Sequence, residues 1–136
     1  MTEQNGAPFD LASLDSMMKA QEEGVEVNIY HPGTGEDLGI VVKVAGPDSK
    51  RVHDARRAIS DQRLKQRRLQ PMTAAEVDRE MIVLLSESIL DWRGVVVSGQ
   101  NIEYSREAAR RLLERFPFIR EQIEKVVGDR RDFIKS

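Results

Sequence analysis

The sequence contains no cysteine, few aromatic residues and no long apolar run. The absence of cysteine excludes disulfides, thiolate metal sites and a cysteine nucleophile. Aromatic residues make up 5% of a chain that is 40% apolar, so Leu, Ile, Val and Met must fill its core. No stretch approaches the roughly 18 apolar residues that cross a membrane, and residues 1–6 lack the basic and apolar parts of a signal peptide. We therefore expect a cytoplasmic protein that does not contact membranes.

The length of the chain predicts one domain, and its charged residues are unevenly distributed along the sequence. A chain of 136 residues can bury one modest core, and we expect a disordered N-terminus (1–9) followed by a single domain (10–136). Residues 1–49 hold two Lys/Arg against nine Asp/Glu, and residues 50–68 hold eight against two. The remainder is mixed, so the chain is acidic, then basic, then nearly balanced, and its net charge is −2.

Alternating side chains predict a small sheet near the N-terminus. Apolar and polar residues alternate over 25–30, which is the period of a half-buried strand. A segment dense in turn formers (31–37) follows, and 38–44 is a suitable returning strand. The run Val95–Val97 is the obvious third strand. The expected fold class is therefore α+β, mainly helical with a small antiparallel β-hairpin or three-stranded sheet.

Two helices are predicted in the first half of the chain. The first runs from a cap at Asp10 to Glu23, and Gly24 ends it. Its apolar stripe is narrow and needs a partner surface; the stripe consists of Leu11, Leu14, Met17 and Met18. The second is a basic helix over about 48–70, opened by Asp48 or Ser49 and stopped by Pro71. Its apolar stripe is thin, comprising Val52, Ala55, Ile59, Gln62, Gln66 and Leu69.

The pattern of apolar residues in the second half of the sequence predicts a helical core over about 73–134. Thr73 and Glu76 form a capping box, after which one apolar face, including Val77, continues to Trp92 and ends at Gly94. We expect this helix to be the centre of the core. Further on, Ser105 caps a helix, Pro117 interrupts the pattern, and Gly128 stops the helix that resumes it. Phe133 and Ile134 are expected to make one last contact.

No residue pattern predicts catalysis, a metal or a cofactor. His31 and His53, the two histidines, lack metal-ligand spacing. Gly33 and Gly35 lie between strands and open no helix, so they do not form a phosphate-binding loop. No pair of carboxylates stands in an apolar setting suited to acid–base work. We expect a protein that is not an enzyme.

The candidate partner-binding residues fall into two groups, one apolar and one basic. Apolar side chains at helix ends belong either to the core or to a groove for an amphipathic helix of a partner; they are Leu85, Ile89, Trp92, Phe116, Phe118 and Ile119. The basic candidates are Arg63, Arg67 and Arg68. The basic helix is either a solvated face, a complement to acidic residues 1–49 of a neighbouring copy, or a stripe that contacts phosphates.

Part of the sequence resembles the tail assembly chaperones of long-tailed bacteriophages. The similarity lies in Asp91-Trp92-Arg93-Gly94, in Ile102-Glu103-Tyr104-Ser105, and in Pro117 followed by Ile119-Arg120-Glu121-Gln122-Ile123. Gly46-Pro47-Asp48-Ser49 and the turn at 32–36 extend it to roughly residues 20–127. In the family, Trp92, Tyr104, Ser105 and Pro117 would act mostly as residues that form the fold.

The resemblance implies a chaperone that escorts the phage tape-measure protein in the host cytoplasm before tail-tube subunits polymerise around it. Homo-oligomers and a possible contact with the tail-tube protein would accompany that role. The alternative is a small DNA-binding regulator that uses the basic helix 50–68. The absence of interleaved aromatic residues argues against nucleic-acid binding.

Overall fold

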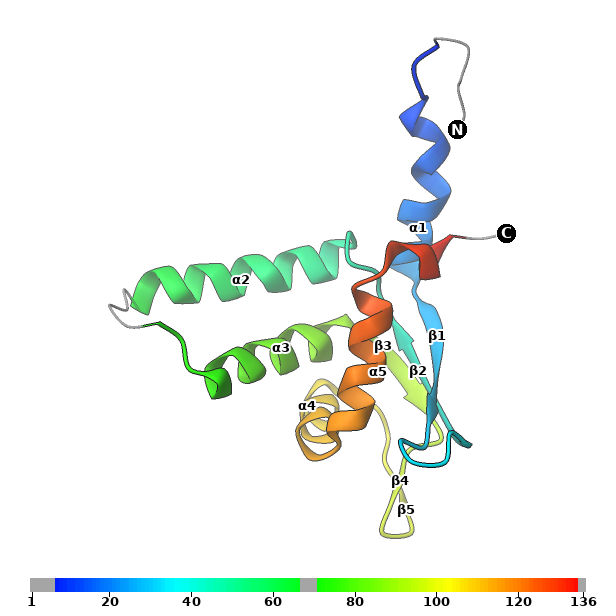
Figure 1. Cartoon of the computed structure of the whole chain (residues 1–136), viewed down its shortest axis with the longest axis vertical. Coiled ribbons are helices and arrows are strands. Elements are labelled where there is room, and N and C mark those ends of the chain that lie inside the picture. The colour runs from blue at the N-terminus through cyan, green and yellow to red at the C-terminus, as the bar shows by residue number, and fades with distance from the viewer. Residues whose placement is uncertain (1–6, 67–70, 135–136) are drawn as a thin grey trace.

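The computed structural model describes residues 7–66 and 71–134 and confirms an α+β, mainly helical fold (Figure 1). The expected disorder of residues 1–6 lies outside the described residues, and residues 7–9 are exposed. In chain order the elements are η1 (Leu11–Leu14), α1 (Asp15–Glu23), β1 (Val25–Tyr30), β2 (Asp37–Val44), α2 (Lys50–Gln66), α3 (Ala74–Ser88), β3 (Ile89–Arg93), β4 (Val96–Val97), β5 (Gln100–Asn101), α4 (Arg106–Arg115), α5 (Pro117–Val127) and η2 (Arg130–Phe133).

The main sheet has the antiparallel order β1-β2-β3, and its third strand is not the predicted one. The hairpin of β1 and β2 is confirmed, with Val25 opposite Val44. The run Val95–Val97 does not join it, because Val96 and Val97 pair with β5 in a separate two-stranded ribbon. The predicted third strand was therefore wrong in its position.

The helix expected to reach Trp92 ends at Ser88, and the chain continues as β3. The backbone N–H of Ala45 donates a hydrogen bond to the Ser88 carbonyl at 2.8 Å, and Ile89 then pairs with Val44. Strand β2 would otherwise present an unpaired row of buried backbone groups, so pairing overrides the helical periodicity of Ile89 and Trp92. Gly94 follows a strand instead of ending a helix.

Helices α4 and α5 pack with α3 over one face of the sheet and complete the main core. The predicted caps are confirmed: the Ser105 hydroxyl accepts a hydrogen bond from the amide of Ala108 at 3.0 Å. Pro117 occupies the first turn of α5, where its missing N–H costs nothing, and Gly128 follows the last residue of α5. Phe133 is buried as expected, whereas Ile134 is 61% exposed.

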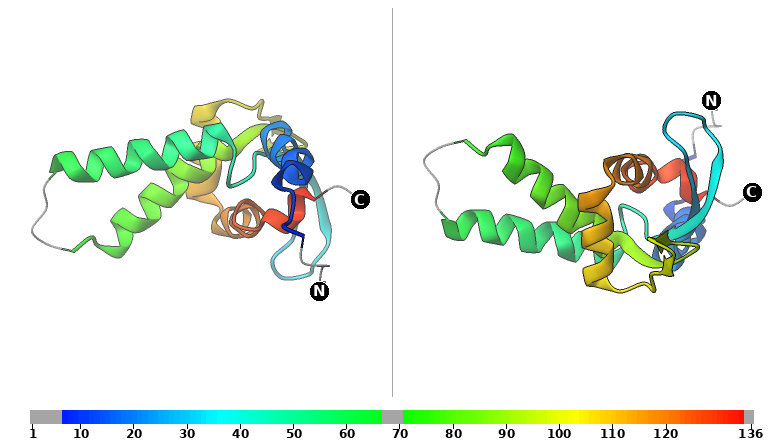
Figure 2. Two further views of the ribbon diagram at one scale, coloured as in Figure 1. Left: turned by 90° about the horizontal axis from the view of Figure 1, so that it is seen from above. Right: turned by 90° about the horizontal axis from the view of Figure 1, so that it is seen from below.

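Helices α2 and α3 form an antiparallel pair that extends away from the sheet (Figures 1 and 2). A second, smaller core joins them and consists of Ala45, Val52, Ala55 and Leu84. The capping box of Thr73 and Glu76 is confirmed at the start of α3. Val77 is 48% exposed and not inward as predicted, because this turn lies beyond the reach of the main core.

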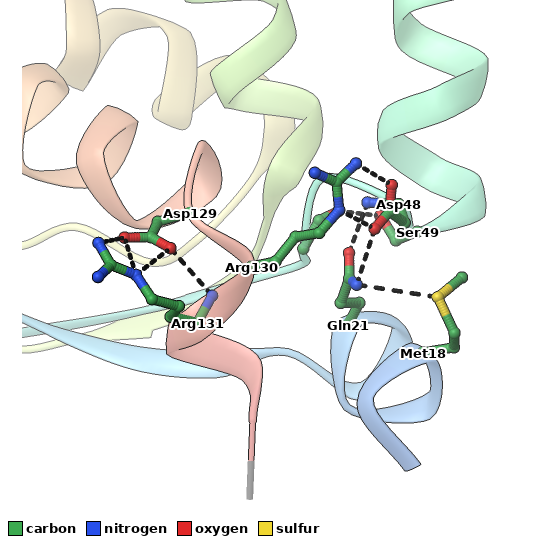
Figure 3. A network of polar contacts seen from close by, with 8 residues as sticks. Met18, Gln21, Asp48, Ser49, Asp129, Arg130 and Arg131 are labelled. Carbon is green, nitrogen blue, oxygen red and sulfur yellow. Dashed lines mark hydrogen bonds and ion pairs between the residues drawn. The ribbon is translucent and has the colours of Figure 1, made fainter. Parts of the chain in front are cut away.

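Helix α1 projects from one end of the sheet in a different direction from the α2–α3 pair (Figure 1), and Gln21 holds it there (Figure 3). The buried Gln21 amide accepts from the backbone N–H of Asp48 and donates to its carboxylate at 3.1 Å. Arg130 binds the same carboxylate, which ties the C-terminal turn to this junction. A Cβ at Gly46 would collide with the Gln21 side chain, so the loop can approach only with glycine there.

Candidate interaction groove

An open groove of about 830 Å³ lies between α2 and α3. Helices α2 and α3 lie side by side, so that their facing sides form its walls (Figure 2). The start of α4 closes one end through Arg106 and Arg110. Its apolar lining consists of Ala45, Ala55, Ala58, Ile59, Val83 and Leu90.

Small side chains on α2 leave this space open. Ala55 is buried and forms part of the floor, whereas Ala58 is exposed along the same wall. Ile59, Val83 and Leu90 are only partly buried, so their remaining apolar surface faces the groove. An apolar floor between charged rims is the form of a site that receives one face of an amphipathic helix.

Three arginines converge on Glu87 at one end of the groove. The carboxylate of Glu87 lies 3.0 Å from Arg106 and 4.0 Å from Arg110. Arg51 reaches the same residue from α2 and donates to its backbone carbonyl at 3.4 Å. Two guanidinium groups therefore lie beside the Glu87 carboxylate and a third at its backbone carbonyl, which leaves local positive charge for an incoming anion.

The other end of the groove is bounded by an ion pair between α2 and α3. Arg63 of α2 donates to both carboxylate oxygens of Glu80. This hydrogen bonding, together with the positive charge, lowers the pKa of Glu80 below its ordinary value of 4.5. The pair is on the surface, so its main effect is to hold the two helices in register.

Four of the six apolar candidates lie in the core of the described structure. Leu85, Ile89 and Ile119 are at most 2% exposed, and Trp92 is 8% exposed. The Trp92 indole N–H donates to the carbonyl of Ile102 at 2.8 Å, and its ring packs edge-on against Tyr104. These side chains stabilise the fold and offer no free surface to a partner in this conformation.

Phe116 and Phe118 are partly exposed beside a second hollow. They contact each other edge to face with ring centroids 6.1 Å apart. They border a space of about 360 Å³ that is also lined by β4 and the first half of β2. Phe116 and Phe118 are therefore the predicted apolar candidates that keep accessible surface.

The basic candidates are placed only in part. Arg63 pairs with Glu80, whereas Arg67 and Arg68 lie outside the described residues. Half of the six Lys/Arg side chains of α2 are already engaged: Lys50 by Asp54, Arg51 by Glu87, and Arg63 by Glu80. This engagement leaves fewer cations for the phosphate contacts that the DNA-binding alternative requires.

Two further findings concern the described residues. Among residues 7–66 and 71–134, no three His, Asp or Glu side chains are grouped so that they could hold a metal ion. Within the same ranges, no helix has the length and apolar character needed to cross a membrane.

Only part of the groove could be predicted from the sequence. The stripe of Val52, Ala55, Ile59 and Gln62 correctly predicted the side of α2 that faces inward. A signal that could have indicated a groove is the small size of Ala55 in that stripe and of Ala58 beside it. The spacing of Arg106 and Arg110 gave no indication that they meet Glu87, because the pairing depends on how α3 and α4 pack.

Comparison with known proteins shows that this small α+β protein derives from a phage. Residues 47–133 match the family described as YdaY prophage protein, and the match spans α2 to η2. The chain belongs to this YdaY prophage family. Neither the curated proteins nor the solved structures contain a match to it. The phage origin implied by the resemblance is thus confirmed, while the family description does not name a tail assembly chaperone.

Proposed function

We propose that the protein is a non-enzymatic tail assembly chaperone that binds a helix of the phage tape-measure protein in the groove between α2 and α3. The observation that carries the proposal is the groove itself, which has an apolar floor and charged rims. Its prophage family and its sequence similarity to tail assembly chaperones support the same role.

The groove suits a helical client because it offers apolar contacts along its floor and charged contacts along its rims. Apolar side chains of a client helix would cover Ile59, Val83 and Leu90. Binding would be favourable because it removes this apolar surface from water. Charged residues on the flanks of that helix would meet the rims and set its orientation. Binding of this kind requires no bond to be made or broken.

Co-expression with the tape-measure protein encoded by the same prophage tests the proposal. The wild-type chain should retain the client in a pull-down. Ala58→Trp, which fills the groove from an exposed position, should reduce retention on the order of tenfold or more. The matched control is Ala75→Trp, at an exposed position of α3 outside the groove, and it should retain the client.

Loss of retention in both tryptophan variants, or in neither, would contradict the groove as the client site. No retention by the wild-type chain, when both proteins remain in solution, would contradict the chaperone role. Steeply salt-dependent binding to duplex DNA by the same preparation would instead favour the regulator.

A further inference from the structure

The α1 end of the molecule carries an apolar stripe that nothing in the described structure covers. Leu11 is 73% exposed, Leu14 is 38% exposed and Met18 is 42% exposed. Their spacing of three and four residues places them on one face, and Phe9, which is 65% exposed, extends the apolar surface outward. The sequence predicted that this stripe needs a partner, and the fold supplies none within the same copy.

The stripe is presented on a helix that is anchored to the rest of the molecule. Gln21, one turn beyond Met18, is buried and fixed by hydrogen bonds to Asp48 (Figure 3). The amide of Gly46 also donates to the Gln21 carbonyl at 2.9 Å. The exposed side chains are therefore held away from the core of their own copy.

The outer end of the stripe and one end of the groove carry opposite charges. Residues 7–23 contain four Asp/Glu and one Lys, and Asp10 and Asp15 lie at the outer end beside the leucines. The charged residues that line the groove balance in sign, four acidic against four basic, but the end at Glu87 gathers Arg51, Arg106 and Arg110 around one carboxylate-bearing residue. Two acidic α1 helices would repel each other, whereas the outer end of α1 and the Glu87 end of the groove attract.

From these observations we infer that the groove between α2 and α3 binds the α1 stripe of a second copy of this chain. Leu11, Leu14 and Met18 would cover the apolar floor. Asp15 would approach Arg51 and the arginines of α4. The apolar contact supplies most of the affinity, and the charges select the partner and its direction. Self-association through this contact does not require the tape-measure protein, which would have to displace α1 to bind.

Sedimentation velocity over a concentration series, with the full chain, tests the inference. The wild type and Ala75→Trp should associate. The double variant Leu11→Ser/Leu14→Ser and the variant Ala58→Trp should each weaken association on the order of tenfold or more. These substitutions are at exposed positions and should leave the circular dichroism spectrum unchanged.

Mixing the two defective variants provides the sharper result. Leu11→Ser/Leu14→Ser keeps an intact groove and Ala58→Trp keeps an intact stripe, so the mixture should associate although neither variant does so alone. A monomeric wild type, or association of Ala58→Trp at the wild-type level, would overturn the inference. A mixture that stays monomeric would overturn it too.

The absence of native cysteine permits a direct test of the contact. A short bis-maleimide should join Leu14→Cys to Ala58→Cys when the two single variants are mixed. Cross-linking of Leu14→Cys to itself, without cross-linking to Ala58→Cys, would show pairing of α1 with α1 and overturn the inference. Because Leu11→Ser/Leu14→Ser keeps its groove, it should still capture the tape-measure protein, so failure of self-association and failure of the chaperone role are distinguishable.

Discussion

At the scale of single residues, buried polar groups determine how the ends of the chain meet the body. Gln21 is fully buried, yet both ends of its amide have partners around Asp48. Leaving either group unsatisfied would cost about 1–3 kcal/mol. Arg130 completes the arrangement from the C-terminal turn, so one carboxylate joins three distant parts of the sequence.

The same carboxylate makes stability depend on pH. The hydrogen bond from Arg130 holds the pKa of Asp48 below its ordinary value of 3.8. The unfolded chain therefore takes up a proton at higher pH than the folded chain. The stabilisation is present above the ordinary pKa and is lost as pH falls through the folded one.

We predict that Asp48→Asn lowers the free energy of unfolding by about 1 kcal/mol near pH 6. The difference from wild type should shrink as the pH falls below 3.8 and through the lowered pKa of folded Asp48, because the native carboxyl then becomes protonated as well. Urea unfolding at several pH values measures it. Asp54→Asn is the control, because its partner Lys50 and the pair itself are exposed. A constant difference over the whole pH range would contradict the prediction.

At the scale of elements, glycine conformation lets the chain leave the end of β3 in close contact with β2. Gly94 has a φ of 82°, and a Cβ there would collide with the backbone carbonyl of Gly39. Gly99 has a similar φ of 79° in the β4–β5 turn, but no atom lies within 4 Å of the position of its Cβ. A side chain at Gly99 would therefore cause backbone strain alone, whereas a side chain at Gly94 would cause the same strain and a steric collision.

Gly99→Ala should destabilise the protein by about 1 kcal/mol, the cost of a left-handed conformation alone. Gly94→Ala should cost about 3 kcal/mol or more, because the collision with β2 adds to that strain. Chemical denaturation of both variants gives the comparison. Equal losses of stability would show that the approach of Gly94 to Gly39 does not matter.

At the scale of the whole molecule, stability should decline from the sheet towards the far end of the α2–α3 pair. The sheet, α4 and α5 share the main core, whereas α2 contributes only Val52 and Ala55 to a small second core. Beyond these residues every side chain from 61 to 66 is exposed, and Leu64 is 73% exposed.

Hydrogen exchange followed by mass spectrometry should reveal this gradient. Amides over 60–66 should exchange at least about tenfold faster than those of α5, since local opening there breaks few buried contacts. Amides of β2 provide an internal reference, because both edges of that strand are paired. Equal protection of 60–66 and α5 would show that the α2–α3 pair is held by contacts beyond its own core.

Local signals in the sequence were enough to predict several elements. Alternation fixed β1 and β2, and side-chain chemistry at Thr73, Ser105 and Pro117 fixed three helix starts, because each cap or turn depends on neighbours a few residues away. The α+β class and the inward side of α2 followed from the same periodicities. Even the exposed stripe of α1 was present in the spacing of its apolar residues.

Packing between elements determined where the third strand lies and which apolar residues remain accessible. Ile89 and Trp92 have the spacing of a helix, but the unpaired edge of β2 made them a strand, with a register shift between Lys43 and Val44 that accommodates the spacing. The main core of the sheet and the helices packed on it buried them together with Leu85 and Ile119, so the candidate site lies instead in the groove between α2 and α3. Local chemistry specifies an element's type, but burial and the meeting of distant charges depend on packing between elements that the sequence does not place side by side.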